Sequence, residues 1–150
     1  MTHKAEARAY LIRLSTYQRQ PLLGHHHQGK LCLSDYGTIV AHEWERSAAN
    51  RSGVDLDLWV VTPAGLESIV IIQMPPPTWA TPGISGLLPS QKPWLLSSFI
   101  ASFKAAAAKR INLCRNLPGQ PVWQSNYHEQ KISTGLHLAQ CRDQLRATAG

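Results

Sequence analysis

The sequence predicts an α+β domain, in which helices pack against an antiparallel sheet. In residues 54–72, two runs rich in β-branched and aromatic residues flank Pro63-Ala64-Gly65, as expected for two antiparallel strands joined by a short turn. Two other segments, 36–49 and 94–116, repeat apolar residues at steps of three and four, which is typical of helices packed on a sheet. The predicted order is strand, helix, hairpin, helix, strand, helix.

The length and composition indicate one soluble domain. At 150 residues the chain has the size of a single domain, and its first eight residues are polar and expected to fray. No apolar run approaches the length of about 18 residues that a membrane helix needs, and the N-terminus lacks the hydrophobic segment of a secretory signal. We therefore expect a cytoplasmic protein without a membrane partner. The three cysteines are far apart and lack a CxxC spacing, so we interpret them as buried, reduced thiols.

The chain is basic. Lys and Arg outnumber Asp and Glu by 15 to 9, which gives a formal net charge of +6. An excess of positive charge suits a polyanionic partner, because cationic side chains neutralise phosphates. Many basic proteins nevertheless bind no nucleic acid, so charge alone does not decide between these alternatives.

The N-terminal third contains two expected strands and the first helix. Residues 10–16 form a strand with one polar face, and residues 30–33 a shorter one. Between them stands the triplet 25–27, which is three consecutive histidines. Neighbouring side chains of an extended segment point to opposite faces and rarely converge on one metal ion, so we expect a solvated loop there. Ser34 or Asp35 is expected to cap the helix 36–49.

The hairpin is followed by residues 73–93, a segment rich in Pro, Gly and Ser. Proline has no N–H to give to a strand ladder, so this segment is expected to be an exposed, mobile loop. A loop of this composition is also a candidate docking site for a partner protein. After the helix 94–116, residues 122–127 are expected to form an edge or closing strand, and a last amphipathic helix is expected from about residue 134.

The helix 94–116 carries a group of cations outside its apolar stripe: Lys104, Lys109, Arg110 and Arg115. Such a group is usually a solvated helix face, and the alternative is contact with phosphates. Trp94 stands at the start of this helix. Its indole could stack on unpaired bases, and the alternative is that it covers an edge of the core.

Ordered blocks of the sequence resemble the HUH single-tyrosine transposases, especially the REP-associated group. The blocks are residues 9–20, 33–40 and 96–127, together with the hairpin 54–72. The signature of that family is a strand, a proline, a polar residue, two histidines separated by one apolar residue, and a second strand. Gly65 and Glu67 stand at the two histidine positions. The resemblance implies a ferredoxin-like antiparallel sheet with helices packed on it.

The resemblance also implies lost chemistry. The family holds a divalent metal ion with the two histidines and attacks the scissile phosphate with a tyrosine. Gly65 has no side chain, and Glu67 alone offers one carboxylate, although Glu67 with His128 would form a weak remnant of a metal site. Gln144 stands where the family carries its tyrosine, and the last helix contains no tyrosine at all.

The leading hypothesis is a catalytically inactive, transposase-like protein that needs no cofactor and binds hairpin or single-stranded DNA. In the resembling family the second long helix borders DNA, so the resemblance implies DNA contacts by a set of its residues: Trp94, Lys104, Lys109, Arg110 and Arg115. One alternative is a subunit of a larger complex that docks proteins through this scaffold or through residues 73–93. A weaker alternative is a metal-dependent nuclease with a relocated active site.

Overall fold

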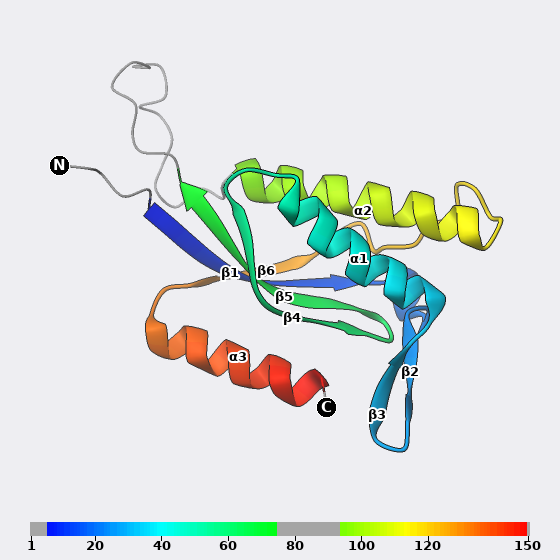
Figure 1. The fold of residues 1–150 in the computed structure, drawn as a ribbon, viewed down its shortest axis with the longest axis horizontal. Helices are drawn as coiled ribbons and strands as arrows, with labels where there is room; N and C mark the ends of the chain where they lie inside the picture. The colour runs from blue at the N-terminus through cyan, green and yellow to red at the C-terminus, as the bar shows by residue number, and fades with distance from the viewer. Residues whose placement is uncertain (1–5, 75–93, 150) are drawn as a thin grey trace, which may run out of the picture.

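The computed structural model describes residues 6–74 and 94–149, which form six strands, three α-helices and one short 3-10 helix (Figure 1). In chain order the elements are β1 (Glu6–Ser15), η1 (Tyr17–Arg19), β2 (Gly24–His27), β3 (Lys30–Leu33), α1 (Asp35–Ala49), β4 (Val54–Thr62), β5 (Gly65–Met74), α2 (Trp94–Cys114), β6 (His128–Ile132) and α3 (Gly135–Ala149).

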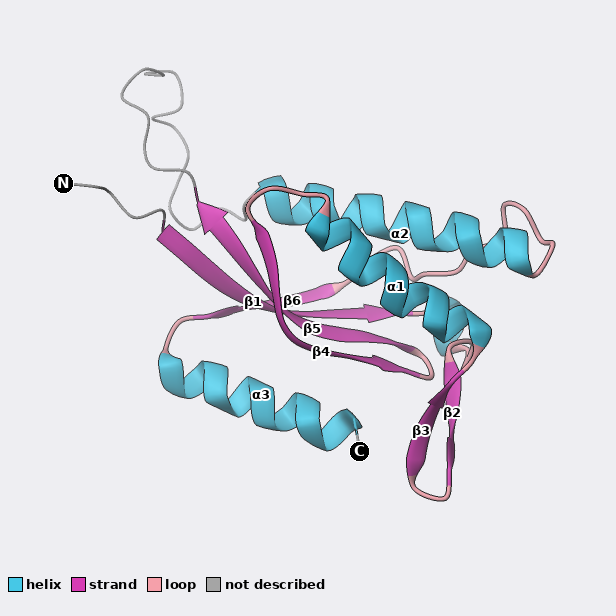
Figure 2. Cartoon of the chain, viewed as in Figure 1, coloured by secondary structure: helices cyan, strands magenta, loops and turns pink. Residues whose placement is uncertain are grey.

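Four strands form one antiparallel sheet in the order β4-β5-β1-β6. β1 and β5 are its central strands, and they pair without interruption from Glu6 opposite Met74 to Ser15 opposite Gly65. The strands β2 and β3 form a separate hairpin that projects from one end of the molecule (Figure 2). The predicted α+β class, an antiparallel sheet with helices packed on it, is confirmed.

The helices cover both faces of the sheet (Figure 1). α1 and α2 pack on one face, and the core beneath them is centred on Trp44 of α1, whose ring contacts Phe99 and Phe103 of α2. The indole Nε1 of Trp44 donates a hydrogen bond to Ser68 Oγ in β5 at 3.1 Å, so this buried polar pair is satisfied. α3 covers the other face through Cys141 and Leu145.

Most element boundaries agree with the sequence-based expectations. α1 begins after Ser34, whose hydroxyl accepts a hydrogen bond from the Gly37 backbone N–H at 3.1 Å, as a helix N-cap does. β1 begins at Glu6, so residues 6–8 of the segment expected to fray are part of a strand. β5 runs to Met74 and therefore takes the first two residues of the segment expected to be a mobile loop. The rest of that loop, 75–93, lies outside the described residues.

The loop predicted at the histidine triplet is wrong in its secondary structure. His25, His26 and His27 belong to β2, which pairs with β3 across a tight turn at Gln28-Gly29 with φ of 50° and 78°. Positive φ at both central residues is the geometry that favours a two-residue hairpin. All three imidazoles are exposed, so the expected solvation holds.

The strand predicted at 122–127 is also wrong. Trp123 forms one isolated bridge with Thr16, while the closing strand β6 is His128–Ile132. Val122 and Trp123 are residue types that are common in strands, but here they serve the core: both are buried, and Trp123 packs against Phe103. β6 is an edge strand with mostly exposed side chains, so its composition carries little strand signal.

The cysteines differ from the expectation in their burial. All three are free thiols, but only Cys141 is buried, and Cys114 is exposed at the end of α2. No helix of the described residues is long and apolar enough to cross a membrane.

Candidate nucleic-acid interface

Three charged or titratable side chains lie in one row across the sheet face that α3 covers. Arg13 of β1 is directly opposite Glu67 of β5 on one side and opposite His128 of β6 on the other. Directly opposed residues of paired strands project from the same face of a sheet. Arg13 Nε lies 2.9 Å from Glu67 Oε1, so the arginine in the middle of the row forms an ion pair with the glutamate.

Gly65, two residues before Glu67, is closed in by the neighbouring strand. A Cβ added at this position would lie 2.2 Å from the backbone oxygen of Leu14, well inside the closest approach of real atoms. The tight packing of β1 against the start of β5 therefore requires glycine here. A histidine, the residue that the resembling signature has at this position, does not fit the present backbone.

The residues of this row do not fit a divalent metal ion. Position 65 cannot provide a ligand, and the carboxylate of Glu67 is bound by Arg13. Glu67 and His128 are on different strands, and β1 with Arg13 lies between them. Within residues 6–74 and 94–149, no three His, Cys, Asp or Glu side chains are arranged to hold a metal ion. A positively charged guanidinium in this row also repels a cation.

α3 turns Cys141 and Leu145 towards the sheet and leaves Gln144 exposed to solvent. Burial raises the pKa of the Cys141 thiol, and the positive charge of Arg13 offsets part of that rise. The α3 side chain that interacts electrostatically with Arg13 is thus a protonated thiol. Gln144 remains on the outer side of the helix, where its backbone oxygen accepts a hydrogen bond from Thr148 Oγ1 at 3.0 Å.

An ion pair fixes α3 to the edge strand β4. Arg142 reaches both carboxylate oxygens of Asp57, with Nε–Oδ1 at 2.9 Å and an N–O distance of 2.7 Å for the second contact. The hydrogen bond from Arg142 lowers the pKa of Asp57, and a bond from the Leu58 backbone N–H at 2.8 Å acts in the same direction.

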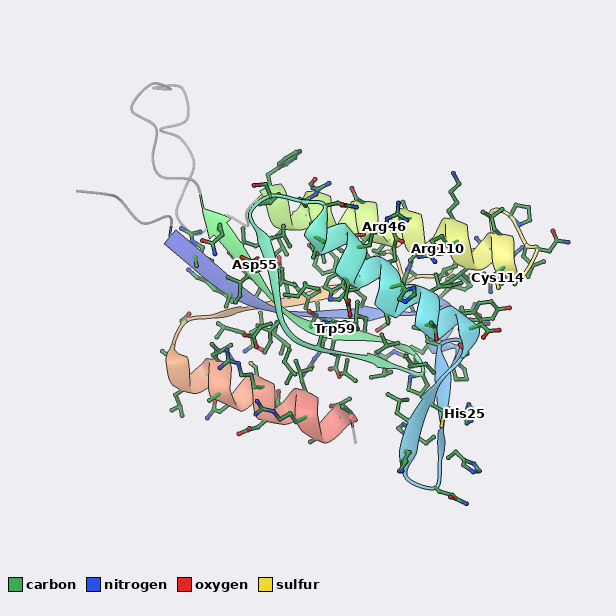
Figure 3. The ribbon with its side chains drawn as sticks, viewed as in Figure 1. His25, Arg46, Asp55, Trp59, Arg110 and Cys114 are labelled. Atoms are coloured by element: carbon green, nitrogen blue, oxygen red, sulfur yellow. The ribbon has the colours of Figure 1, made fainter. Side chains whose placement is uncertain are left out.

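Most of the cations predicted to bind DNA from the helix 94–116 are engaged within the protein. Lys104 Nζ donates to the Gln124 backbone oxygen at 2.6 Å, and burial lowers the pKa of this lysine. Arg110 points towards α1 and pairs at 2.9 Å with Glu43, whose side chain is only 8% exposed (Figure 3). Arg115 donates to Asn112 Oδ1 at 2.8 Å. The structure therefore gives three of these four cations an internal contact.

The other two residues of the predicted set face solvent. Lys109 is exposed, and Trp94 is 78% exposed at the first residue of α2. They lie far apart on the helix, separated by four turns of about 3.6 residues. The predicted set is consequently not one compact patch.

A cleft of about 190 Å³ opens where β1 ends, between η1 and the segment that leads into β6. Arg13, Arg19 and His128 contribute its charged or titratable lining, and the rest is mainly polar, from Ser15 and residues 124–126. A second cleft of about 370 Å³ shares Arg13 and His128 and also contacts Glu129. Arg13 and Arg19 were not among the predicted DNA-binding residues, because strand register and turn conformation bring them together and neither is visible as a sequence motif.

No protein-family model and no curated protein sequence matches this chain. Among solved structures, a REP-associated tyrosine transposase bound to a REP hairpin is similar with a TM-score of 0.54 and 11% identity, over 97% of this chain and 68% of that one. A protein of Deinococcus radiodurans R1 provisionally classed as a transposase is similar with a TM-score of 0.57 and 14% identity, over 99% of this chain and 95% of that one. At these identities the likeness concerns the backbone, and on that ground the chain has a transposase-like fold.

Proposed function

We propose that this protein is a catalytically inactive, transposase-like protein that binds hairpin or single-stranded DNA. The observation that carries the proposal lies in strands β1 and β5: Gly65 leaves no space for a side chain, and Arg13 binds the carboxylate of Glu67. Transfer of a DNA strand through a tyrosine needs a cation that stabilises the departing oxygen and a phenol that attacks phosphorus. The described part of α3 contains no tyrosine, and its inward residues are Cys141 and Leu145.

Two further observations support DNA as the partner. The formal net charge is +6, Lys109 is an exposed cation of α2, and Arg13 and Arg19 are exposed cations around the cleft at the end of β1. One of the structural neighbours is a transposase bound to a hairpin of REP DNA. A scaffold of this shape that retains a basic surface suits binding to DNA without cutting it.

The experiment combines binding and chemistry on the same labelled probes: a DNA hairpin, the corresponding single strand and a duplex. We expect binding at low salt that favours the hairpin or the single strand, and no covalent protein–DNA adduct on a denaturing gel with Mg²⁺ or Mn²⁺. An adduct, or cleaved product, would overturn the inactive part of the proposal. Absence of binding at low salt to all three probes would overturn the DNA-binding part and favour a protein-docking role.

A further inference from the structure

We propose that the cleft at the end of β1 binds a nucleic-acid phosphate directly through Arg13 and Arg19, with no metal ion between protein and phosphate. This inference rests on the proposed DNA-binding function and specifies where and how the phosphate is held. The cleft lies beside η1 at the end of β1, and its lining contains none of the cations predicted from the helix 94–116, so it makes a prediction separate from theirs.

The charges that line the cleft favour an anion. Arg13, Arg19 and His128 contribute to its walls together with hydroxyl and amide side chains, and no carboxylate is part of the lining. Of the acidic groups beside the cleft residues, Glu67 is bound to Arg13, and Glu129 lines the neighbouring cleft. An arginine offers five N–H donors. Arg13 uses its Nε to contact Glu67, and its side chain remains 50% exposed. Donors of the guanidinium therefore remain for a phosphate, whose oxygens its planar fork can bind in pairs.

The backbone of η1 is held in a conformation that brings Arg19 to the cleft. Gln18 and Arg19 both have left-handed φ values, 54° and 53°, which non-glycine residues seldom adopt. Thr16 fixes this turn, since its backbone oxygen accepts from the Arg19 N–H at 2.9 Å and its hydroxyl donates to the Gln20 oxygen at 2.7 Å. Unfavourable backbone conformations of this kind persist where the surrounding structure imposes them, and they are common at ligand sites.

The opposite wall is also fixed before any ligand binds. The Tyr17 N–H donates to the Val122 oxygen at 2.8 Å, and the Gln124 N–H donates to the Ser15 oxygen at 2.9 Å. Lys104 reaches from α2 to the Gln124 oxygen and thereby positions the same segment. A preformed site loses little conformational entropy when it binds. The volume of about 190 Å³ is below the roughly 300 Å³ of ordinary small-molecule pockets, so the cleft suits a phosphate group better than a whole nucleotide.

The test measures the affinity of the full chain for a fluorescein-labelled single-stranded oligonucleotide and a labelled hairpin by anisotropy, in EDTA and in Mg²⁺. We expect Arg13→Gln and Arg19→Gln each to weaken binding about tenfold or more, as loss of a charge-assisted contact does. Arg46→Gln is the matched control, because Arg46 is an exposed arginine on α1 and its replacement removes the same charge (Figure 3). We expect its affinity to stay within about twofold of the wild type.

Glu67→Gln separates a guanidinium site from a metal site. If Arg13 holds the phosphate, removal of the competing carboxylate leaves affinity unchanged or higher, and EDTA has no effect. Wild-type binding that EDTA abolishes, or Arg13→Gln and Arg19→Gln binding as tightly as Arg46→Gln, would overturn this inference while leaving DNA binding itself intact. A wild type that binds neither probe would remove the proposed function and this inference together. Arg19→Gln keeps the test decisive if Arg13→Gln fails to fold, since Arg19 is exposed.

Discussion

At the scale of single residues, Gly65 determines how closely the start of β5 can pack against β1. Glycine offers no metal ligand at this position, and a Cβ added here would lie 2.2 Å from the backbone oxygen of Leu14. The close packing of the two central strands and the lack of a side chain at position 65 are therefore one structural fact. A side chain at this position requires β1 to move, so a metal ligand cannot be introduced here by side-chain replacement alone.

The first prediction concerns Gly65. We expect Gly65→Ala to lower the free energy of unfolding by about 1–3 kcal/mol, the usual cost of forcing atoms into a packed core, and Gly65→His to lower it further. Urea denaturation followed by circular dichroism measures this change. Gly135→Ala is the control, because an added Cβ there meets nothing within 4 Å and the residue is in α3, where alanine is the better helix former. Equal stability of Gly65→Ala and wild type would contradict the packing argument.

The second prediction concerns Asp57 and pH. Because Arg142 lowers the pKa of Asp57 in the folded protein, this carboxylate stabilises the fold above its unfolded value of 3.8, and the contribution is lost as the pH falls through the lower folded pKa. The pair is partly exposed, so we expect Asp57→Asn to cost up to about 1 kcal/mol at neutral pH.

Urea midpoints measured from neutral pH to below pH 3.8 check this expectation. The difference in urea midpoint between the wild type and Asp57→Asn should become smaller only in the acidic part of that range. Asp55→Asn serves as the control, since Asp55 is an exposed carboxylate of the same strand. A gap that stays constant across the range would show that Asp57 does not act through its charge.

At the scale of elements, periodicity was sufficient for the helices and for the hairpin β4–β5. Periodicity failed where a buried residue does not belong to a strand, or where a strand has exposed side chains. Trp123 is buried without belonging to a strand of the sheet, whereas β6 pairs with β1 although its side chains are mostly exposed. The pair Arg13–Glu67 was invisible for a similar reason. It depends on the register of β1 against β5, and residues far apart in sequence give no local signal of register.

The third prediction concerns the contact between α1 and α2. As a solvated helix residue, Arg110 would be replaceable at little cost, but it pairs with Glu43, which is 8% exposed. We expect Arg110→Ala to lower the free energy of unfolding by about 1–3 kcal/mol, because a buried carboxylate loses its partner. Lys109→Ala, one position earlier on the exposed side of α2, is expected to change it by less than about 0.5 kcal/mol. Thermal and urea denaturation of both variants measure the difference. Similar stability for the two variants would mean that the ion pair contributes nothing.

At the scale of the whole molecule, two surfaces are candidates for the proposed contact with DNA. One is the α2 surface predicted from the sequence, of which Lys109 and Trp94 face solvent. The other is the cleft at the end of β1, with Arg13 and Arg19. Both belong to a transposase-like fold, so the likeness to solved structures does not choose between them.

The salt dependence of binding provides the choice, and it gives the last prediction. Each phosphate neutralised on a single strand adds about 0.7 to the slope of log affinity against log salt. If Arg13 and Arg19 each contact a phosphate, the double variant Arg13→Gln/Arg19→Gln should flatten that slope by about 1.4, whereas Lys109→Ala combined with Arg46→Gln should leave it nearly unchanged. The second pair removes the same two charges from exposed positions on α1 and α2, so it controls for net charge. The reverse pattern, flattening by the helix pair and none by the cleft pair, would move the DNA to the α1–α2 side of the molecule.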